Sequence, residues 1–191
     1  MNTLKSKLTL TMVILLTTLS FEVSHACISN EYNKAYSLFK HSDYRDSLLG
    51  FTDLYKGGCP TSPYFLGIHY AYGLGVKQNY EIAIKYFNDF LDKDNGKQPR
   101  SYRANTYLAL AIIYKSKGQL QKAHEYLVES AKIGNTEAMF LLGRSYIDKT
   151  QPYYTQTNLK GAFFWLNKAA LYGNVAAMKL INDNSLYDSK S

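Results

Sequence analysis

The sequence predicts an all-α fold: a right-handed α-solenoid of about four helix-turn-helix repeats that ends in a capping helix. Three observations predict it. Apolar and small residues recur at helical spacing, glycines interrupt these stripes, and related units follow one another along the 191 residues. A single helical hairpin cannot bury its own apolar face, so several must stack to form a continuous core.

The clearest unit runs from Leu66 to Phe87. Leu66, Gly67 and Tyr70 share one face of a predicted first helix, and Ala83 and Phe87 open the apolar stripe of a second helix. Gly67 and Ala83 lack bulk where the two helices must cross closely. The unit is therefore predicted to be an antiparallel helical hairpin.

Two glycines mark the turn of this unit. Gly73 and Gly75 can adopt positive φ, which stops the first helix before the second begins. In the first repeat, Ser42-Asp43-Tyr44 takes the place of this turn, and Gly57-Gly58 ends the second helix. The first repeat is therefore a less regular version of the same hairpin.

Three units share the same columns of residues, which predicts three hairpins of similar packing. The first helices carry pairs of a large and a small residue followed by a tyrosine, and the second helices carry an alanine followed four residues later by a large apolar residue. These columns are Leu66-Gly67, Leu110-Ala111 and Leu142-Gly143; Tyr70, Tyr114 and Tyr146; Ala83, Ala123 and Ala162; and Phe87, Leu127 and Leu166.

The predicted organisation is a leader over 1–26, a repeat domain over 27–181 and a frayed tail over 182–191. Two segments lengthen the links between helices, Asp94 to Arg103 and Asp148 to Asn158. Such insertions project from one side of a solenoid, either as part of a binding site or as tolerated surface loops. The approximate repeats are 29–60, 61–96, 101–135 and 136–174, with a cap over 175–181.

These columns resemble Sel1-like repeats, relatives of the tetratricopeptide repeat. The resemblance covers about Pro63 to Ile181, and Asn30 to Pro60 more weakly. The third repeat departs from it because Tyr114 to Gly118 carries no GxGV turn. The residues that carry the resemblance are Leu66-Gly67, Tyr70, Gly73-Leu74-Gly75-Val76 and Ala83, and later Leu142-Gly143, Tyr146, Ala162, Trp165, Ala169-Ala170 and Tyr172-Gly173-Asn174.

The first 26 residues have the pattern of a secretory signal peptide. Lys5 and Lys7 precede an apolar run from Leu8 to Leu19, which is too short to span a bilayer. Ser24-His25-Ala26 places small residues at the −3 and −1 positions, so cleavage before Cys27 is expected. The sequence therefore predicts a periplasmic or secreted protein without a membrane span.

Cys27 and Cys59 are the only cysteines, and export would expose both to an oxidising compartment. We expect a disulfide between them, which would stabilise the fold by about 3–4 kcal/mol in the chain-entropy model. Two alternatives remain, a free thiol or a lipid anchor on Cys27. A lipoprotein signal would carry leucine at the position of Ser24, which disfavours the anchor.

The sequence carries no recognisable catalytic motif. It contains no HExxH, GxSxG, phosphate-binding loop or CxxC, and His41, His69 and His124 fall in three different repeats. The segment from Asp92 to Gly96 does not match a calcium loop, because its glycine comes one position early. We therefore expect no enzyme activity, no bound metal and no cofactor.

The chain is basic, with a formal net charge of +7 at pH 7. Its lysines and arginines are spread singly along the sequence, so no basic helix face predicts nucleic-acid binding. Two interpretations remain open for this charge. It either solvates the surface or attracts an acidic protein or an anionic envelope.

A partner is expected on the first helices, which line the concave side of such solenoids. The residues predicted to face it are aromatic or aliphatic and include one arginine, a composition typical of protein interfaces. The alternative is that neighbouring first helices bury these side chains against one another. The predicted residues are Tyr32, Tyr36, Tyr64, Ile68, Tyr72, Leu108, Ile112, Phe140 and Arg144.

The family resemblance implies a non-catalytic protein-protein interaction module of the bacterial envelope. Small exported chains of this kind include immunity proteins that bind and occlude an envelope-targeting toxin, for example a secreted phospholipase, and this is the specific expectation. A first alternative is a secreted effector or host-interaction factor. A second is an enzyme that binds cell-wall fragments, although relatives of that kind carry a cysteine pair in each repeat.

Overall fold

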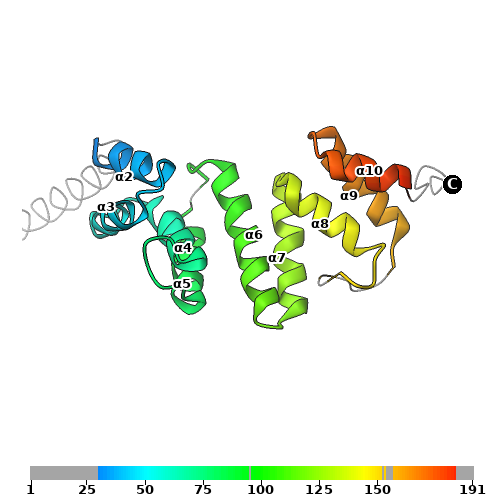
Figure 1. Cartoon of the computed structure of the whole chain (residues 1–191), viewed down its shortest axis with the longest axis horizontal. Coiled ribbons are helices and arrows are strands. Elements are labelled where there is room, and N and C mark those ends of the chain that lie inside the picture. Colours follow the sequence, from blue (N-terminus) through cyan, green and yellow to red (C-terminus); the bar gives the residue numbers. More distant parts are fainter. Residues whose placement is uncertain (1–29, 95, 152, 154–156, 184–191) are drawn as a thin grey trace, which may run out of the picture. The chain divides into compact units, whose positions relative to one another are not determined.

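The computed structural model describes residues 30–94, 96–151, 153 and 157–183, which form helices and no strand (Figure 1). This confirms the predicted all-α fold. The chain divides into two compact units, which meet in sequence between Lys93 and Asp94. Unit 1 holds α2 (Asn30–Lys40), α3 (Tyr44–Lys56), α4 (Ser62–Tyr72) and α5 (Tyr80–Lys93), and unit 2 holds α6 (Arg100–Ser116), α7 (Leu120–Ile133), α8 (Thr136–Ser145), α9 (Leu159–Leu171) and α10 (Val175–Asp183).

The core of unit 1 is aromatic. Phe51 of α3 and Phe65 of α4 stack with their ring centroids 4.2 Å apart. Phe87 and Phe90 of α5 are fully buried. The stack of Phe51 on Phe65 joins the two hairpins of unit 1, where α3 packs on α4, while Phe87 lies against Gly67 inside the second hairpin. Edge-to-face and offset ring contacts of this kind add to the gain from removing the rings from water.

The turn glycines behave as the sequence predicts. Gly73 has φ +68° and caps α4 in the left-handed conformation, with its N–H bonded to the carbonyl of His69. Gly75 also has φ +68°, and a Cβ placed on it would lie 2.6 Å from the backbone of Tyr44 and Arg45. The loop therefore lies directly against the start of α3 and admits no side chain at this position.

Helices α4 and α5 cross at Gly67. A Cβ atom on this residue would lie 2.5 Å from the ring of Phe87, so the ring occupies the space that any other side chain would need. The same arrangement recurs in unit 2, where a Cβ on Gly143 would lie 2.7 Å from Leu166. Small residues in the first helix thus set how closely each second helix approaches.

A buried histidine joins three helices of unit 1. The side chain of His69 on α4 is fully buried. Its Nδ1 lies 2.7 Å from the carbonyl oxygen of Leu74, and its Nε2 lies 3.2 Å from the hydroxyl of Ser47 on α3. Phe39 of α2 packs edge-on against the ring at 5.5 Å. His69 is therefore part of the packed core.

Unit 2 repeats the hairpin with aliphatic residues. Leu110, Leu127, Leu142 and Leu166 are fully buried, and α6 packs on α7, α7 on α8, and α8 on α9. One buried polar group, the hydroxyl of Ser130, donates to a carbonyl of α6 at 2.7 Å, which satisfies it away from water. Helix α10 packs on α9 and continues to Asp183, two residues beyond the predicted cap.

The segment that precedes α6 is tied to that helix by an ion pair. Arg103 Nε lies 2.7 Å from Asp94 Oδ2, and the Asp94 side chain is almost fully buried. Removing one partner of such a pair would leave an uncompensated charge. The lengthened link predicted from Asp94 to Arg103 is therefore bonded to unit 2 rather than free.

Several sequence predictions lie outside the described residues. These are the leader over 1–26, Cys27 and the tail beyond residue 183. Cys59 follows α3 and is buried. Its bond to Cys27 stays a prediction.

Replacing Gly67 with alanine should destabilise the protein by about 1–3 kcal/mol, because the added methyl group collides with the ring of Phe87. Urea unfolding followed by circular dichroism measures this. The matched control is Lys85→Ala on the exposed side of α5, which should change the free energy of unfolding by less than about 0.5 kcal/mol. Equal stability of Gly67→Ala and the wild type would contradict the close crossing.

The stability should fall in mild acid. Burial lowers the pKa of His69 more than its bond to the Leu74 carbonyl raises it, and burial also lowers the pKa of His124. The unfolded chain then binds more protons than the folded chain below about pH 6.5, so the free energy of unfolding decreases as the pH falls. Each histidine contributes a slope of at most about 1.4 kcal/mol per pH unit.

Urea unfolding between about pH 7.5 and pH 5 measures this slope. A His69→Gln variant cannot take up the proton, so its free energy of unfolding should depend less on pH. An unchanged slope in this variant would remove His69 as a source of the acid sensitivity.

Candidate protein-binding surface

The predicted binding residues of α2 form an ordered aromatic pair. The rings of Tyr32 and Tyr36 stack with centroids 6.2 Å apart, and Tyr36 packs edge-on against Phe65 of α4 at 5.7 Å. Tyr32 is part-buried, and Tyr36 is 37% exposed. Because its inner edge is fixed by packing, Tyr36 offers a partner a ring that loses little conformational entropy on binding.

The predicted residues of α4 divide between core and surface. Tyr64 is a correction, because it is only 8% exposed and packs against Phe65 and Phe90 at 5.0 and 5.7 Å. Ile68 is part-buried, whereas Tyr72, at the end of the helix, is 50% exposed. Tyr36 and Tyr72 are thus the large side chains that the first helices of unit 1 expose among the predicted residues.

In unit 2, α6 carries Leu108 and Ile112 one turn apart, and both are part-buried. One turn before Leu108, the amide oxygen of Asn105 accepts a hydrogen bond of 2.9 Å from Asn135, which caps α8 through Ala138 N–H. This bond links the start of α8 to α6.

Helix α8 carries the one charged residue of the predicted set. The guanidinium carbon of Arg144 lies 5.6 Å from the ring centroid of Phe140, one turn earlier, and its Nη2 donates to the side-chain oxygen of Gln151. The Arg144 Nε is buried and makes no hydrogen bond within the protein. The guanidinium is thus held by the Phe140 ring and the Gln151 side chain, and its buried Nε is not accessible to a partner.

The structure reveals aromatic pairs that the sequence prediction overlooked. Tyr70 and Tyr86 stack at 5.8 Å between α4 and α5, and Tyr114 and Tyr126 stack at 5.4 Å between α6 and α7. The Lys122 ammonium lies 4.3 Å from the Tyr114 ring centroid. The sequence does carry a signal for these pairs. The residue before each of Phe87, Leu127 and Leu166 is aromatic, namely Tyr86, Tyr126 and Trp165.

The insertion of the fourth repeat is part of unit 2 where it is described. Tyr153 is buried, its carbonyl oxygen lies 3.2 Å from the His124 ring, and Lys115 lies 5.8 Å from its ring centroid. Hydrogen bonds from Thr150 and Gln151 lower the pKa of Asp148 at the start of the insertion. The described part of the insertion thus packs on α6 and α7.

The three histidines of the described residues all bind backbone carbonyls. His41 Nδ1 lies 2.8 Å from the carbonyl of Ser37, while His69 and His124 bind other backbone carbonyls. No group of three histidine, cysteine, aspartate or glutamate side chains lies close enough to hold a metal ion within this part of the chain. None of the described helices combines the length and apolar composition needed to cross a bilayer.

The structure is similar to two solved structures. One is a Sel1 repeat protein from Oxalobacter formigenes, with a TM-score of 0.63 and 22% identity over 80% of this chain and 61% of that one. The other is a protective antigen of uropathogenic Escherichia coli strains that displays a Sel1-like repeat (SLR) fold. It has a TM-score of 0.62 and 18% identity over 91% of this chain and 37% of that one. The chain thus spans less than two thirds of the length of either protein. No protein-family model and no curated protein matches it.

Two tyrosines of α4 should respond differently to truncation. Tyr64→Ala removes a buried ring, so it should lower the free energy of unfolding by about 3 kcal/mol or more. Tyr72→Ala removes a half-exposed ring and should lower it by less than about 1 kcal/mol. Thermal and urea unfolding of both variants test this. Similar losses in the two variants would contradict the assignment of Tyr64 to the core and Tyr72 to the surface.

Proposed function

We propose, from the Sel1-like repeat fold of this chain, that it acts as a non-catalytic module that binds another protein through its first helices. Folds of this kind present rows of side chains from stacked hairpins and need no reactive group to do so. The function is then carried by the surface, and the described polar groups are free to serve packing and capping.

The observation that carries this proposal is the set of Tyr36, Tyr72 and Arg144. Each lies on a first helix, each is at least partly exposed, and each belongs to a residue type that dominates binding energy at interfaces. Tyr36 and Arg144 are also held in place by neighbouring rings. Preordered side chains of this kind bind with a smaller entropic cost than flexible ones.

The finer proposal is an immunity protein of the bacterial envelope. The predicted leader supports export, and the single repeat domain suits a role in which the protein covers a toxin. Such a protein would work by occlusion, with its first helices seated over the substrate entrance of an envelope-targeting enzyme such as a phospholipase. Arg144 is part-exposed and would then pair its guanidinium group with a carboxylate of the toxin.

The experiment is a capture of partners from envelope extract of the producing bacterium, with the purified protein as bait. We expect one lethal enzyme at a stoichiometric level, and inhibition of that enzyme by the protein. Tyr72→Ala and Arg144→Ala should each weaken binding by about 30-fold, which corresponds to about 2 kcal/mol. Titration calorimetry with the captured enzyme measures the change.

The matched control is Lys85→Ala on a second helix, which should leave affinity unchanged. A partner that binds all these variants equally well would show that the first helices are not the binding surface. Capture of host receptors alone would exclude the immunity role while leaving a protein-binding module intact. Turnover of a substrate by the purified protein would contradict the whole proposal.

A further inference from the structure

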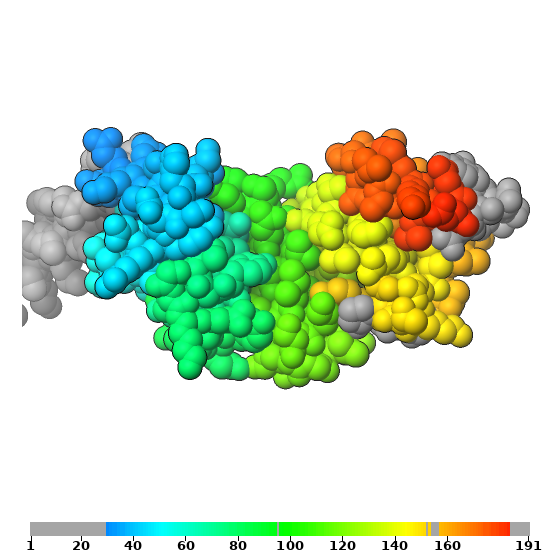
Figure 2. Space-filling view, viewed as in Figure 1, coloured from blue at the N-terminus to red at the C-terminus, as the bar shows by residue number. Residues whose placement is uncertain are grey.

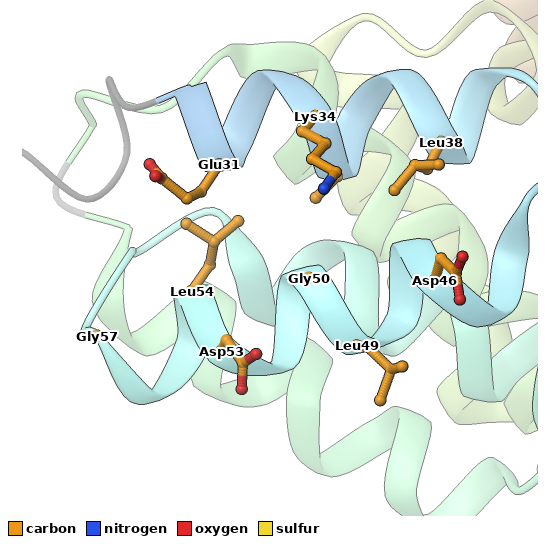
Figure 3. Close-up of a pocket in the computed structure, with 10 residues that line it drawn as sticks. Glu31, Lys34, Leu38, Asp46, Leu49, Gly50, Asp53, Leu54 and Gly57 are labelled. Carbon is orange, nitrogen blue, oxygen red and sulfur yellow. The ribbon is translucent and has the colours of Figure 1, made fainter.

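The first hairpin contains an open apolar groove between α2 and α3. The groove encloses about 520 Å³, and Ala35, Leu38, Gly50 and Leu54 contribute its apolar lining (Figure 3). Beside it, Leu49 is 58% exposed. The surface of this hairpin is blue to cyan in Figure 2. An apolar hollow of this size is large enough to take a large side chain from outside the hairpin.

The repeat register can be extended to this hairpin. Ser47, Phe51 and Leu54 of α3 are buried at the spacing of Ala83, Phe87 and Phe90 of α5. The buried Ala35 of α2 likewise corresponds to the buried Gly67 of α4. The alignment places each residue of the first hairpin opposite a residue of the second.

The register shows what the first hairpin lacks. Leu38 and Gly50 stand at the positions of Tyr70 and Tyr86, whose rings stack in the second hairpin. Tyr114 and Tyr126 stack at the same positions in the third. The groove therefore lies where two aromatic rings fill the surface of the following hairpins. The chain itself could not readily supply a ring at position 50, because a Cβ on Gly50 would lie 2.9 Å from the Cβ of Ala35.

The rim of the groove is acidic. Glu31, Asp46 and Asp53 lie around it with one basic residue, Lys34, although the chain as a whole carries a net charge of +7. Asp53 also pairs with Lys56 of α3 at 3.1 Å, and both of these side chains are largely exposed. Asp46 and Asp53 are two turns apart on α3, which is about 10.5 Å along the helix. Leu49 and Gly50 lie between them. A ligand with an aromatic group between two cations would match this pattern.

Helix α9 carries that pattern on its own surface. Phe164 is 51% exposed and lies between Lys160 and Lys168, one turn away on either side. The Lys168 ammonium lies 5.0 Å from the centroid of Phe164 and 5.6 Å from that of Trp165. The two lysines are separated by about 12 Å along the helix, close to the spacing of the two aspartates on α3.

More apolar surface surrounds Lys160, Phe164 and Lys168, which we call the α9 stripe. Of the large apolar side chains that are exposed in the described residues, six lie in α9, α10 or the turn between them. A cluster of this kind, interspersed with lysines, is typical of an interaction surface. Its members are Leu159, Phe164, Leu171, Tyr172, Val175 and Met178.

We propose that the groove of one copy binds the α9 stripe of a second copy, so that the protein associates head to tail. Phe164 of one molecule enters the groove between Leu38 and Gly50 of the next, and its flanking lysines meet Asp46 and Asp53. The interface is heterologous, because the two surfaces differ, and it adds copies one after another unless a ring closes.

Sedimentation velocity of the purified protein tests this. We expect the average mass to rise with concentration across the micromolar range and to fall when salt is added, because the contact is partly ionic. Leu49→Lys should disable the groove, and Phe164→Glu should disable the α9 stripe. Each variant alone should therefore be monomeric. Both residues are more than half exposed, so the variants should fold, which circular dichroism verifies.

The decisive experiment mixes the two variants. Each retains the surface that the other has lost, so an equimolar mixture should form a one-to-one dimer and nothing larger. Lys85→Glu, a larger charge change at an exposed position of α5, should associate like the wild type. A wild type that is monomeric at all concentrations would overturn the proposal. So would self-association of Phe164→Glu, which would indicate a symmetric contact between two grooves.

Discussion

The fold depends on the close crossing of the two helices in each hairpin. Gly67 and Gly143 bring a first helix so near to the second that the rings or branches of Phe87 and Leu166 lie directly over the backbone. The third hairpin has Ala111 at the same position, and this residue is also fully buried. No side chain at this position is therefore larger than a methyl group. Every larger side chain must then point away from the crossing, toward a neighbouring helix or toward solvent.

The candidate binding residues lie on the same first helices as these crossings. In unit 1, rings that leave the crossing from α2 and α4 meet one another, which orders Tyr36 while leaving part of it exposed. In unit 2, Phe140 supports the guanidinium of Arg144 in the same way. A surface assembled from such residues is rigid because the core behind it is close-packed. In the proposed function, recognition and stability would therefore depend on the same contacts.

The fold could be predicted because its signals are local. The spacing of Leu66, Gly67 and Tyr70 specifies a helix face, and Gly73 ends the helix whatever surrounds it. The same spacing of residues predicts the later hairpins in the order in which they occur along the chain. No long-range information was needed, since within each unit the helices pack mainly on those next to them in sequence.

The exposure of individual side chains could not be predicted in this way. Tyr64 and Tyr72 lie on the same helix and are the same residue type, yet Phe65 and Phe90 bury one while the other ends the helix in solvent. That difference depends on the length and tilt of neighbouring helices. The groove of the first hairpin escaped prediction for a related reason, since a missing ring at Gly50 is visible only when the hairpins are aligned.

The contact between Lys168 and Trp165 has a practical consequence, because this is the chain's only tryptophan among 18 tyrosines. Excitation at the long-wavelength edge of the absorption band selects that indole, so the emission comes from α9 alone. The wild-type protein therefore carries its own fluorophore beside the stripe, and changes in ammonium position or solvent access there alter its intensity without any attached dye.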